Sequence, residues 1–454
     1  MPELIRKKKK MSSFEMIAFG FAGVILLGAI ILMLPISSSA GVVTPFDKTL
    51  FTATSAVCVT GLVVVDTGSY WSAFGQAVIL LLIQTGGLGV ITVVASFSMV
   101  SGRKISLMQR STMQDAISAP KVGGIVRLTK FILQGTFLIE LVGAILMLPV
   151  FCKDYGWKGI WMSVFHSVSA FCNAGFDILG TTEQAFPSLT GYIANPLINL
   201  VIMLLIVIGG IGFLTWDDFC TNKWNLKRYR LQSKIILVTT AVLILLPAIF
   251  FFLSDFAGFS MGKRILASFF QSVTLRTAGF NTADLGAMND SSKAIMTLMM
   301  LIGGSPGSTA GGMKTTTIAV LILNAFATFG REPETEVFGR RFDNTVVKNA
   351  ATIAILYFFL FFAGGIAISQ IEHVALSDCL FETASAVGTA GLTLGITTEL
   401  GLVSHLILVV LMYLGRVGGL TLIYAAISVK IQSGAKRPLD KITCLLYTSP
   451  SPRD

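Results

Sequence analysis

Long runs without a charged residue constrain the fold of this chain more than any other feature. Six of them lie at residues 16–46, 67–102, 184–216, 235–254, 294–313 and 349–371. A helix needs about 20 predominantly apolar residues to cross a hydrocarbon core of about 30 Å. Since 54% of all residues are hydrophobic and only 13% are charged, the apolar surface exceeds what a soluble core can bury. The sequence therefore predicts an all-α integral membrane protein.

The basic residues fit a membrane topology better than nucleic-acid binding. The net charge is +10, but the lysines and arginines form clusters at the ends of apolar runs. The cluster at residues 6–10 has the charge of a signal peptide, yet no small-residue cleavage site follows, so we expect a retained helix. The six cysteines form no CxxC pair and have no histidine at metal-ligand spacing, so we expect no disulfide framework, metal site or covalent cofactor.

A short motif recurs four times along the chain. It consists of a first residue that is polar in three copies, a small residue, glycine and a large apolar residue, and its glycines are Gly61, Gly175, Gly279 and Gly391. These marker glycines lie 114, 104 and 112 residues apart. A repeat at such a period indicates a repeated architecture. We expect four tandem repeats at 14–100, 126–221, 233–329 and 345–430.

Each repeat is predicted to hold two membrane helices and one short pore helix. The apolar segment before each marker runs for about a dozen residues, which is too short to span the bilayer but long enough to enter it and stop. Eight crossings are expected at 14–34, 73–100, 128–150, 196–219, 234–253, 293–328, 346–368 and 401–429.

The distribution of positive charge predicts the orientation. The segments 6–10, 101–130, 222–234, 329–348 and 430–441 hold five, six, five, four and four basic residues, while the alternate loops are mostly acidic. Cytoplasmic loops carry the excess of lysine and arginine. Both termini are therefore expected in the cytoplasm, and the pore helices enter from outside.

Four re-entrant loops around one axis imply a pore, because irregular backbone at membrane depth must be packed in protein or line water. Rings of backbone carbonyls can replace the water shell of potassium, and glycine suits the crowded position. The dipole of each pore helix favours a cation at its C-terminal end. We expect a selectivity filter around one pseudo-four-fold axis, formed by Val59, Thr60, Gly61, Asn173, Ala174, Gly175, Thr277, Ala278, Gly279, Thr389, Ala390 and Gly391.

The four motifs Cys58-Val59-Thr60-Gly61, Cys172-Asn173-Ala174-Gly175, Arg276-Thr277-Ala278-Gly279 and Gly388-Thr389-Ala390-Gly391 together resemble the Trk/Ktr/HKT superfamily of potassium transporters. Within it, the chain is similar to the membrane subunits of bacterial Ktr systems. The resemblance implies K+ uptake by a plasma-membrane homodimer, each subunit with its own pore. It also implies a cytoplasmic, KtrA-like regulatory ring, which binds the nucleotide in place of this chain. Relatives with serine at the first filter glycine tend to admit sodium, so Gly61 implies potassium selectivity, with Na+ as a possible activator.

A gate is expected beneath the filter. The run 303–312 contains Pro306 and several glycines, which disfavour regular helix, and the superfamily has an intramembrane loop at this place. Arg416 lies in the uncharged span 400–429, where a buried charge costs at least ~2.5 kcal/mol unless it is paired or hydrated. The alternatives are a kinked packing helix and an arginine bonded to nearby carbonyls. The predicted gate residues are Arg416, Gly303, Gly304, Ser305, Gly307, Gly311, Gly312 and Lys314.

Four other polar residues lie within apolar segments. Arg276 is expected to point away from the pore and to pair with Glu382 or with pore-helix carbonyls. Glu140 fits either a sodium or proton site or a packing hydrogen bond. His166 and His405 are interpreted as ordinary helix residues.

The last residues do not fit the rest of the chain. Residues 444–454 match what a transposon end and sequencing adapter would encode, so we interpret them as a library artefact.

Two other classes of function are alternatives to a potassium pore. A secondary cation or solute symporter also uses broken helices but commonly has inverted repeats. A membrane enzyme is disfavoured because no nucleophile with a base and no metal motif is present.

Overall fold

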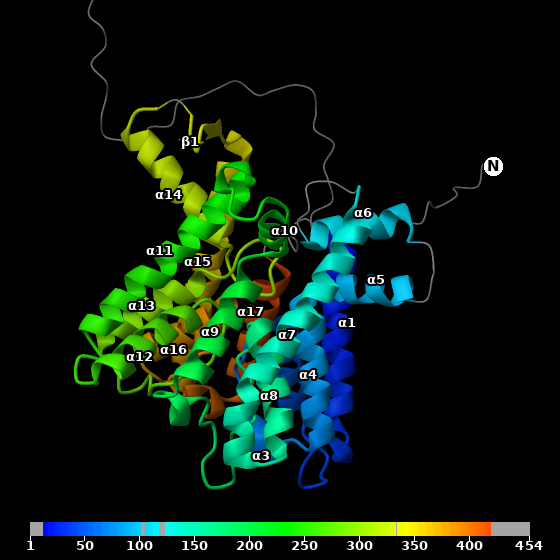
Figure 1. The fold of residues 1–454 in the computed structure, drawn as a ribbon. Coiled ribbons are helices and arrows are strands. Elements are labelled where there is room, and N and C mark those ends of the chain that lie inside the picture. The colour runs from blue at the N-terminus through cyan, green and yellow to red at the C-terminus, as the bar shows by residue number, and fades with distance from the viewer. Residues whose placement is uncertain (1–11, 101–104, 118–122, 333, 419–454) are drawn as a thin grey trace, which may run out of the picture.

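The computed structural model describes residues 12–100, 105–117, 123–332 and 334–418, and these are mainly helical (Figure 1). The predicted artefact at 444–454, the second half of the predicted span 401–429 and the basic clusters at 6–10 and 430–441 lie outside the described residues.

Four long helices run through the molecule. They are α1 (Ser13–Met33), α7 (Ile125–Tyr155), α11 (Leu231–Leu253) and α15 (Asn344–Glu372), and each is long and apolar enough to cross a membrane. A helix that is apolar on all sides is stable in lipid, where its backbone groups are satisfied internally. Each lies where the sequence predicts the first helix of a repeat.

A helix of 13 or 14 residues precedes each marker glycine. These helices are α2 (Phe46–Cys58), α8 (Lys158–Phe171), α12 (Met261–Thr274) and α16 (Leu376–Gly388). Each packs against the long helix before it. In three pairs a pore-helix hydroxyl donates to a carbonyl of the long helix: Ser167 to Glu140, Ser272 to Ile244 and Thr383 to Phe361. Where no water is available, these bonds fix the depth of the short helices.

The second helix of the first two repeats is broken, which corrects the predicted continuous spans 73–100 and 196–219. The chain bends by 99° between α4 (Ala73–Leu88) and α5 (Val90–Val100), and by 97° between α9 (Pro196–Gly210) and α10 (Phe213–Asn222). Gly89 and Gly212 occupy the breaks at φ values of 87° and 91°. Side chains rarely adopt this conformation, so glycine permits the bends.

The second helices of the other two repeats are also interrupted or short. In the third, residues 302–314 separate α13 (Asp290–Leu301) from α14 (Thr315–Phe329). In the fourth, α17 (Leu402–Val417) ends before Gly418, whose φ is 89°. The described residues hold four straight candidate spans, or six if each bent pair counts as one. The predicted count of eight crossings is reached only if α13 with α14 forms a seventh span and α17 contributes an eighth.

Shorter elements connect these helices. The hairpin of β1 (Glu336–Val337) and β2 (Arg340–Arg341) lies at the end of the molecule that carries α10 (Figure 1). The others are η1 (Pro35–Ser37), α3 (Thr67–Tyr70), α6 (Leu107–Ile117), η2 (Thr190–Tyr192), η3 (Leu226–Arg228) and η4 (Ile396–Thr398).

Candidate functional site

The four marker glycines meet in a ring. A Cβ added to each would lie close to the carbonyl oxygen that precedes the next glycine: Gly61 at 2.6 Å from Ala174, Gly175 at 2.7 Å from Ala278, Gly279 at 3.0 Å from Ala390 and Gly391 at 2.0 Å from Thr60. At these distances any side chain would collide with backbone. The ring thus joins loops that are far apart in the sequence, and only glycine fits at its four corners.

The residue two positions before each glycine has the left-handed conformation. The φ values are 57° at Val59, 58° at Asn173, 59° at Thr277 and 52° at Thr389. Asparagine tolerates this region, but for the three β-branched residues it is strained and must be held by surrounding structure. Strain of this kind concentrates at functional sites.

Backbone hydrogen bonds close the pore helices beside the ring, and the third differs from the others. Thr60, Ala174 and Ala390 donate to carbonyls five residues back, those of Ser55, Ser169 and Ser385, at 2.7–2.8 Å. This is the closure of a helix that ends with a left-handed residue. Ala278 instead donates to Thr274, four residues back, at 3.0 Å. The third loop is thus one residue tighter, a difference that motif counting does not reveal.

Glycines of the second helices press against the pore-helix ends. A Cβ at Gly86, Gly209 or Gly415 would lie 2.0–2.2 Å from the carbonyl oxygens of Val57, Phe171 and Val387, respectively. These contacts were not expected from the sequence. The signal that indicates them is the glycine three positions before each of the positive-φ glycines Gly89, Gly212 and Gly418.

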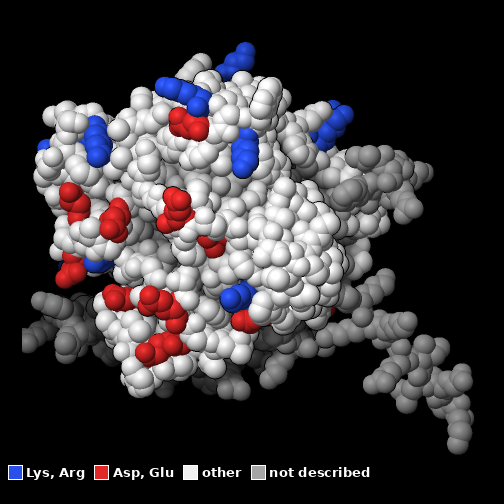
Figure 2. Space-filling model, turned by 90° about the horizontal axis from the view of Figure 1, so that it is seen from below, with Lys and Arg blue, Asp and Glu red and all other residues white. Residues whose placement is uncertain are grey.

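With the outer side taken as up, an outer cavity of about 130 Å³ opens above the ring, at the end of the molecule that carries α3 and points down in Figure 1. All four marker glycines line it, together with Asp66 and Asp177. Figure 2 shows the face seen from below, which carries acidic side chains across its middle and most of its visible lysines and arginines toward one edge. A negative potential at such a mouth favours cations over anions.

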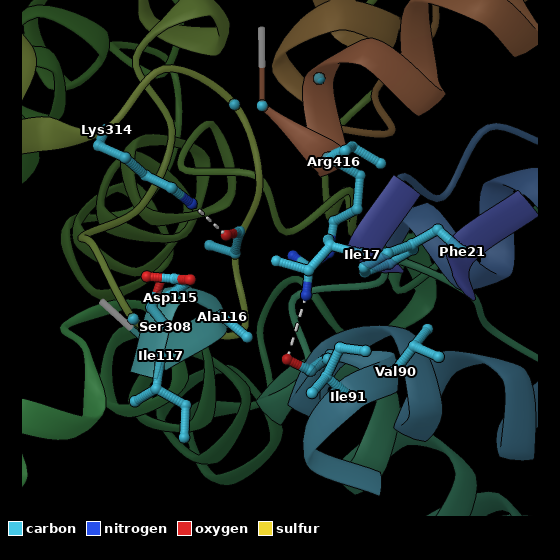
Figure 3. Close-up of a pocket in the computed structure, with 18 of the residues that line it drawn as sticks. Ile17, Phe21, Val90, Ile91, Asp115, Ala116, Ile117, Ser308, Lys314 and Arg416 are labelled. Carbon is cyan, nitrogen blue, oxygen red and sulfur yellow. Dashed lines mark hydrogen bonds between the residues drawn. The ribbon is translucent and has the colours of Figure 1, made fainter. Parts of the chain in front are cut away.

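An inner cavity of about 340 Å³ lies beneath the ring (Figure 3). Arg416 reaches into it from α17 and donates to the carbonyls of Thr309, Gly86 and, at 3.1 Å, Gly87. The last two oxygens belong to the final turn of α4, where the carbonyl-bearing end of the helix attracts a cation. Arg416 is therefore bonded to nearby carbonyls, as its packing alternative requires. Because these carbonyls belong to α4 and to the intramembrane loop, the charge of Arg416 lies in the space between the two.

Of the predicted gate residues in and after the loop, Gly307, Gly312 and Lys314 line this cavity, and the others pack within or beside the loop. Gly303 donates to the carbonyl of Met313 at 2.8 Å and Thr315 to that of Gly304 at 3.0 Å, which closes the loop at its base. Ser305 donates to Gly210 at 2.9 Å, and Lys314 Nζ donates to Ala310 at 2.8 Å.

Close approach explains several glycines of the loop. A Cβ on Gly307 would lie 2.4 Å from the carbonyl oxygen of Ile117 in α6. On Gly311 it would lie 2.3 Å from Thr389 Oγ1, and on Gly312 it would lie 2.6 Å from the carbonyl oxygen of Gly388. The loop therefore fits directly under the fourth filter motif.

The predicted pairing of Arg276 with Glu382 is wrong. Glu382 accepts from Thr393 Oγ1, Thr397 Oγ1 and the backbone of Leu394 at 2.5–3.1 Å, so it braces the segment that follows the fourth motif. Arg276 is buried, and its Nε and Nη2 have no hydrogen-bond partner among the described residues. The hydroxyls of Thr393 and Thr397, which lie close to Glu382 in the chain, bind its carboxylate in place of Arg276.

The remaining polar residues have partners within the helices. Glu140 is buried in α7, and Gln84 Nε2 donates to its Oε2 at 3.3 Å, as the packing alternative requires. His166 Nδ1 lies 2.7 Å from the carbonyl of Met162, and His405 Nε2 lies 2.8 Å from that of Thr397.

Comparison with known proteins matches nearly the whole chain. The family profile described as "TrkH: Cation transport protein" matches residues 21–435. The chain is 37% identical over 430 residues to potassium/sodium uptake protein NtpJ of Enterococcus hirae, covering 92% of this chain and 94% of the relative. It is 37% identical over 418 residues to Ktr system potassium uptake protein B of Bacillus subtilis, covering 90% and 92%. The crystal structure of the potassium transporter TrkH from Vibrio parahaemolyticus has the same fold, with a TM-score of 0.72 at 18% identity over 93% of this chain and 86% of that chain.

Proposed function

This chain belongs to the TrkH family of cation transport proteins, and we propose from this premise that it carries potassium ions selectively into the bacterial cell. It is a membrane cation transporter and not an enzyme. The observation that carries the proposal is the ring of Gly61, Gly175, Gly279 and Gly391, in which each glycine faces the carbonyl of the next loop.

The ring supplies what selection of K+ requires. Four backbone loops converge so closely that a Cβ added to any marker glycine would meet the backbone of the next loop. Carbonyl oxygens replace the hydration shell of a potassium ion. The buried hydroxyls of Thr60, Thr277 and Thr389 have no partner among the described residues, which fits oxygens that face ions or water. The twelve residues predicted for the filter are proposed in that role.

The gate is proposed to consist of Arg416 and the loop 303–312 with Lys314. The supporting observation is that Arg416 joins the loop to α4 directly under the ring. A fixed guanidinium in a narrow cavity repels cations, so both parts must move before ions pass.

The assembly is proposed from the relatives. One relative is named as part of a Ktr system, which supports a partner component; we propose a homodimer bound to a cytoplasmic, KtrA-like regulatory ring that holds the nucleotide. The name of another includes sodium, which supports a role for Na+ beside K+, and activation is the role that we propose. The clustering of basic residues in alternate loops supports a plasma-membrane orientation with both termini in the cytoplasm.

The test is flux into proteoliposomes that contain the purified chain. A potassium gradient alone should drive uptake of radioactive rubidium, whereas a symporter with a site at the bends of α4 and α9 would need a co-substrate gradient. Gly61→Ser and Gly279→Ser should lower the K+/Na+ ratio, because a hydroxymethyl group disturbs the carbonyl ring. Gly23→Ser is the control, since Gly23 has open space around it. An unchanged ratio in both filter variants would refute the filter assignment.

A further inference from the structure

Thr309 of the intramembrane loop is bonded to the second filter motif. Its Oγ1 donates to the carbonyl of Phe171 at 2.9 Å and lies 3.1 Å from Asn173 Oδ1. Its backbone N–H donates to the carbonyl of Gly209 at 3.2 Å. Thr309 and Asn173 are almost completely buried. The loop and the filter therefore share polar contacts that cannot be replaced by bulk water.

Asn173 extends this contact to the third filter motif. Its Nδ2 donates to the carbonyl of Arg276 at 3.2 Å. Exchanging the amide oxygen and nitrogen would set two oxygens against each other at Arg276, so the hydrogen bonds fix the orientation of the side chain. Of the four residues at this position, Asn173 has the only amide; the others are Val59, Thr277 and Thr389.

Two further features show that the contact is built into the site. A Cβ on Gly209 would lie 2.8 Å from Thr309 Oγ1 and 2.9 Å from Asn173 Oδ1, so a larger residue there would separate the pair. The carbonyl of Thr309 accepts from Arg416. Thr309 therefore joins the arginine below to the filter above.

We propose that Thr309 and Asn173 form a latch through which the intramembrane loop holds the second and third filter motifs in register. Movement of the loop then both opens the path and loosens ion discrimination. This inference rests on the proposed function and adds that selectivity depends on the state of the gate. Thr309 acts here as a positioning residue, because its hydroxyl contacts the end of α8 and the Asn173 side chain.

The principal variant is Thr309→Val, which keeps the shape and removes the hydroxyl. It should raise rubidium flux and lower the K+/Na+ permeability ratio roughly tenfold, about the effect of one buried hydrogen bond left unmade. Thr309→Ser should restore both values. Thr352→Val is the matched control, because that exposed hydroxyl donates only to Lys348 in its own helix, at 2.9 Å.

A double-mutant cycle tests the pair. Asn173→Thr introduces the residue that the third and fourth motifs hold at the same φ. If the latch exists, the change in permeability ratio for Thr309→Val with Asn173→Thr should be no larger than for the more affected single variant. Additive changes would overturn the pairing. Higher flux in Thr309→Val with an unchanged ratio would overturn the link between gate and filter.

A second measurement separates the latch from the transport proposal. The concentrations of K+ and of Na+ that stabilise the detergent-solubilised protein against heating are compared for each variant. A shift in the ratio of these concentrations in Thr309→Val, reversed in Thr309→Ser, supports the latch even if the unaltered protein gives no flux, a result that would count against the proposed function alone. Identical ratios in all variants would overturn the latch.

Discussion

At the scale of single residues, Arg416 places a charge where carbonyls from the loop and from α4 converge under the glycine ring. Replacing it by alanine should raise the initial rate of K+ uptake at least roughly tenfold, because removing even ~1.4 kcal/mol of charge repulsion changes a rate by that factor. The uptake rate of Arg416→Lys should lie between those of the unaltered protein and Arg416→Ala, since lysine keeps the charge without the planar guanidinium that binds two carbonyls at once.

Uptake by vesicles with equal protein content measures this effect. Arg341→Ala serves as control, because that guanidinium is exposed and bonded to Glu334. The barrier is contradicted if Arg416→Ala takes up potassium at the unaltered rate.

On the outer side, Asp177 is the residue whose charge is expected to affect the rate of K+ entry. It is half-buried and lines the outer cavity with Asp66. Asp177→Asn should slow K+ entry several-fold at low ionic strength and hardly at all at high, because the screening length falls from about 30 Å at 0.01 M to about 3 Å at 1 M salt. The test is the initial rate of uptake at both ionic strengths with choline chloride as the added salt.

Asp290→Asn is the comparison for Asp177, since that acid is exposed and lies outside the cavity. Equal slowing at both salt concentrations would mean that Asp177 acts through structure and not through its field.

At the scale of elements, the bend after α4 depends on backbone conformation and not on space, whereas at Gly212, after α9, an added Cβ would also lie 2.7 Å from the carbonyl oxygen of Pro306. Nothing lies closer than 3.8 Å to a Cβ built on Gly89, yet its φ is 87°. Gly89→Ala should therefore destabilise the protein by about 1–3 kcal/mol. Gly23→Ala, in an exposed and regular part of α1, should stabilise it by about 0.5–1 kcal/mol.

Thermal unfolding in detergent, followed for both variants, distinguishes these effects. If both shift the midpoint in the same direction, the assignment of the bend to the φ of Gly89 is incorrect.

The elements differ in how far the sequence predicts them. Runs without charge predict α1, α11 and α15, because hydropathy alone decides whether a long helix enters lipid. The helix α7 contains Glu140 and is predicted from its place in the repeat. The bends at Gly89 and Gly212 were not predicted because hydropathy carries no information about φ, although the sequence shows a glycine at both positions. The predicted pairing of Arg276 with Glu382 is wrong because hydroxyls after the fourth motif bind Glu382, and distance along the sequence does not reveal such competition.

At the scale of the whole molecule, three of the four quarters make the same contact and then diverge. Gly86, Gly209 and Gly415 each press against a pore-helix carbonyl. The next residues are Gly87, Gly210 and Arg416. Of these three positions, only the fourth quarter's carries a charge, and Arg416 lines the inner cavity, while the third quarter supplies the loop. The repeats thus favour a symmetric ring, and their differences favour a gate on one side of it.

The orientation of the whole molecule gives the last prediction. Basic residues gather in the loops at the end that carries α10 and the β hairpin, which the positive-inside rule assigns to the cytoplasm. Cys220 is an exposed free cysteine on α10, and Ser39 is exposed between α1 and α2 at the opposite end. A membrane-impermeant maleimide should label Ser39→Cys in intact cells and Cys220 only after permeabilisation.

Peptide-resolved mass spectrometry reads both sites in one sample, so each serves as the control of the other. Labelling of Cys220 in intact cells while residue 39 stays protected would reverse the orientation. The acidic cavity would then face the cytoplasm and Arg416 would face outward. Such an arrangement would place the negative potential on the wrong side to collect potassium from dilute surroundings.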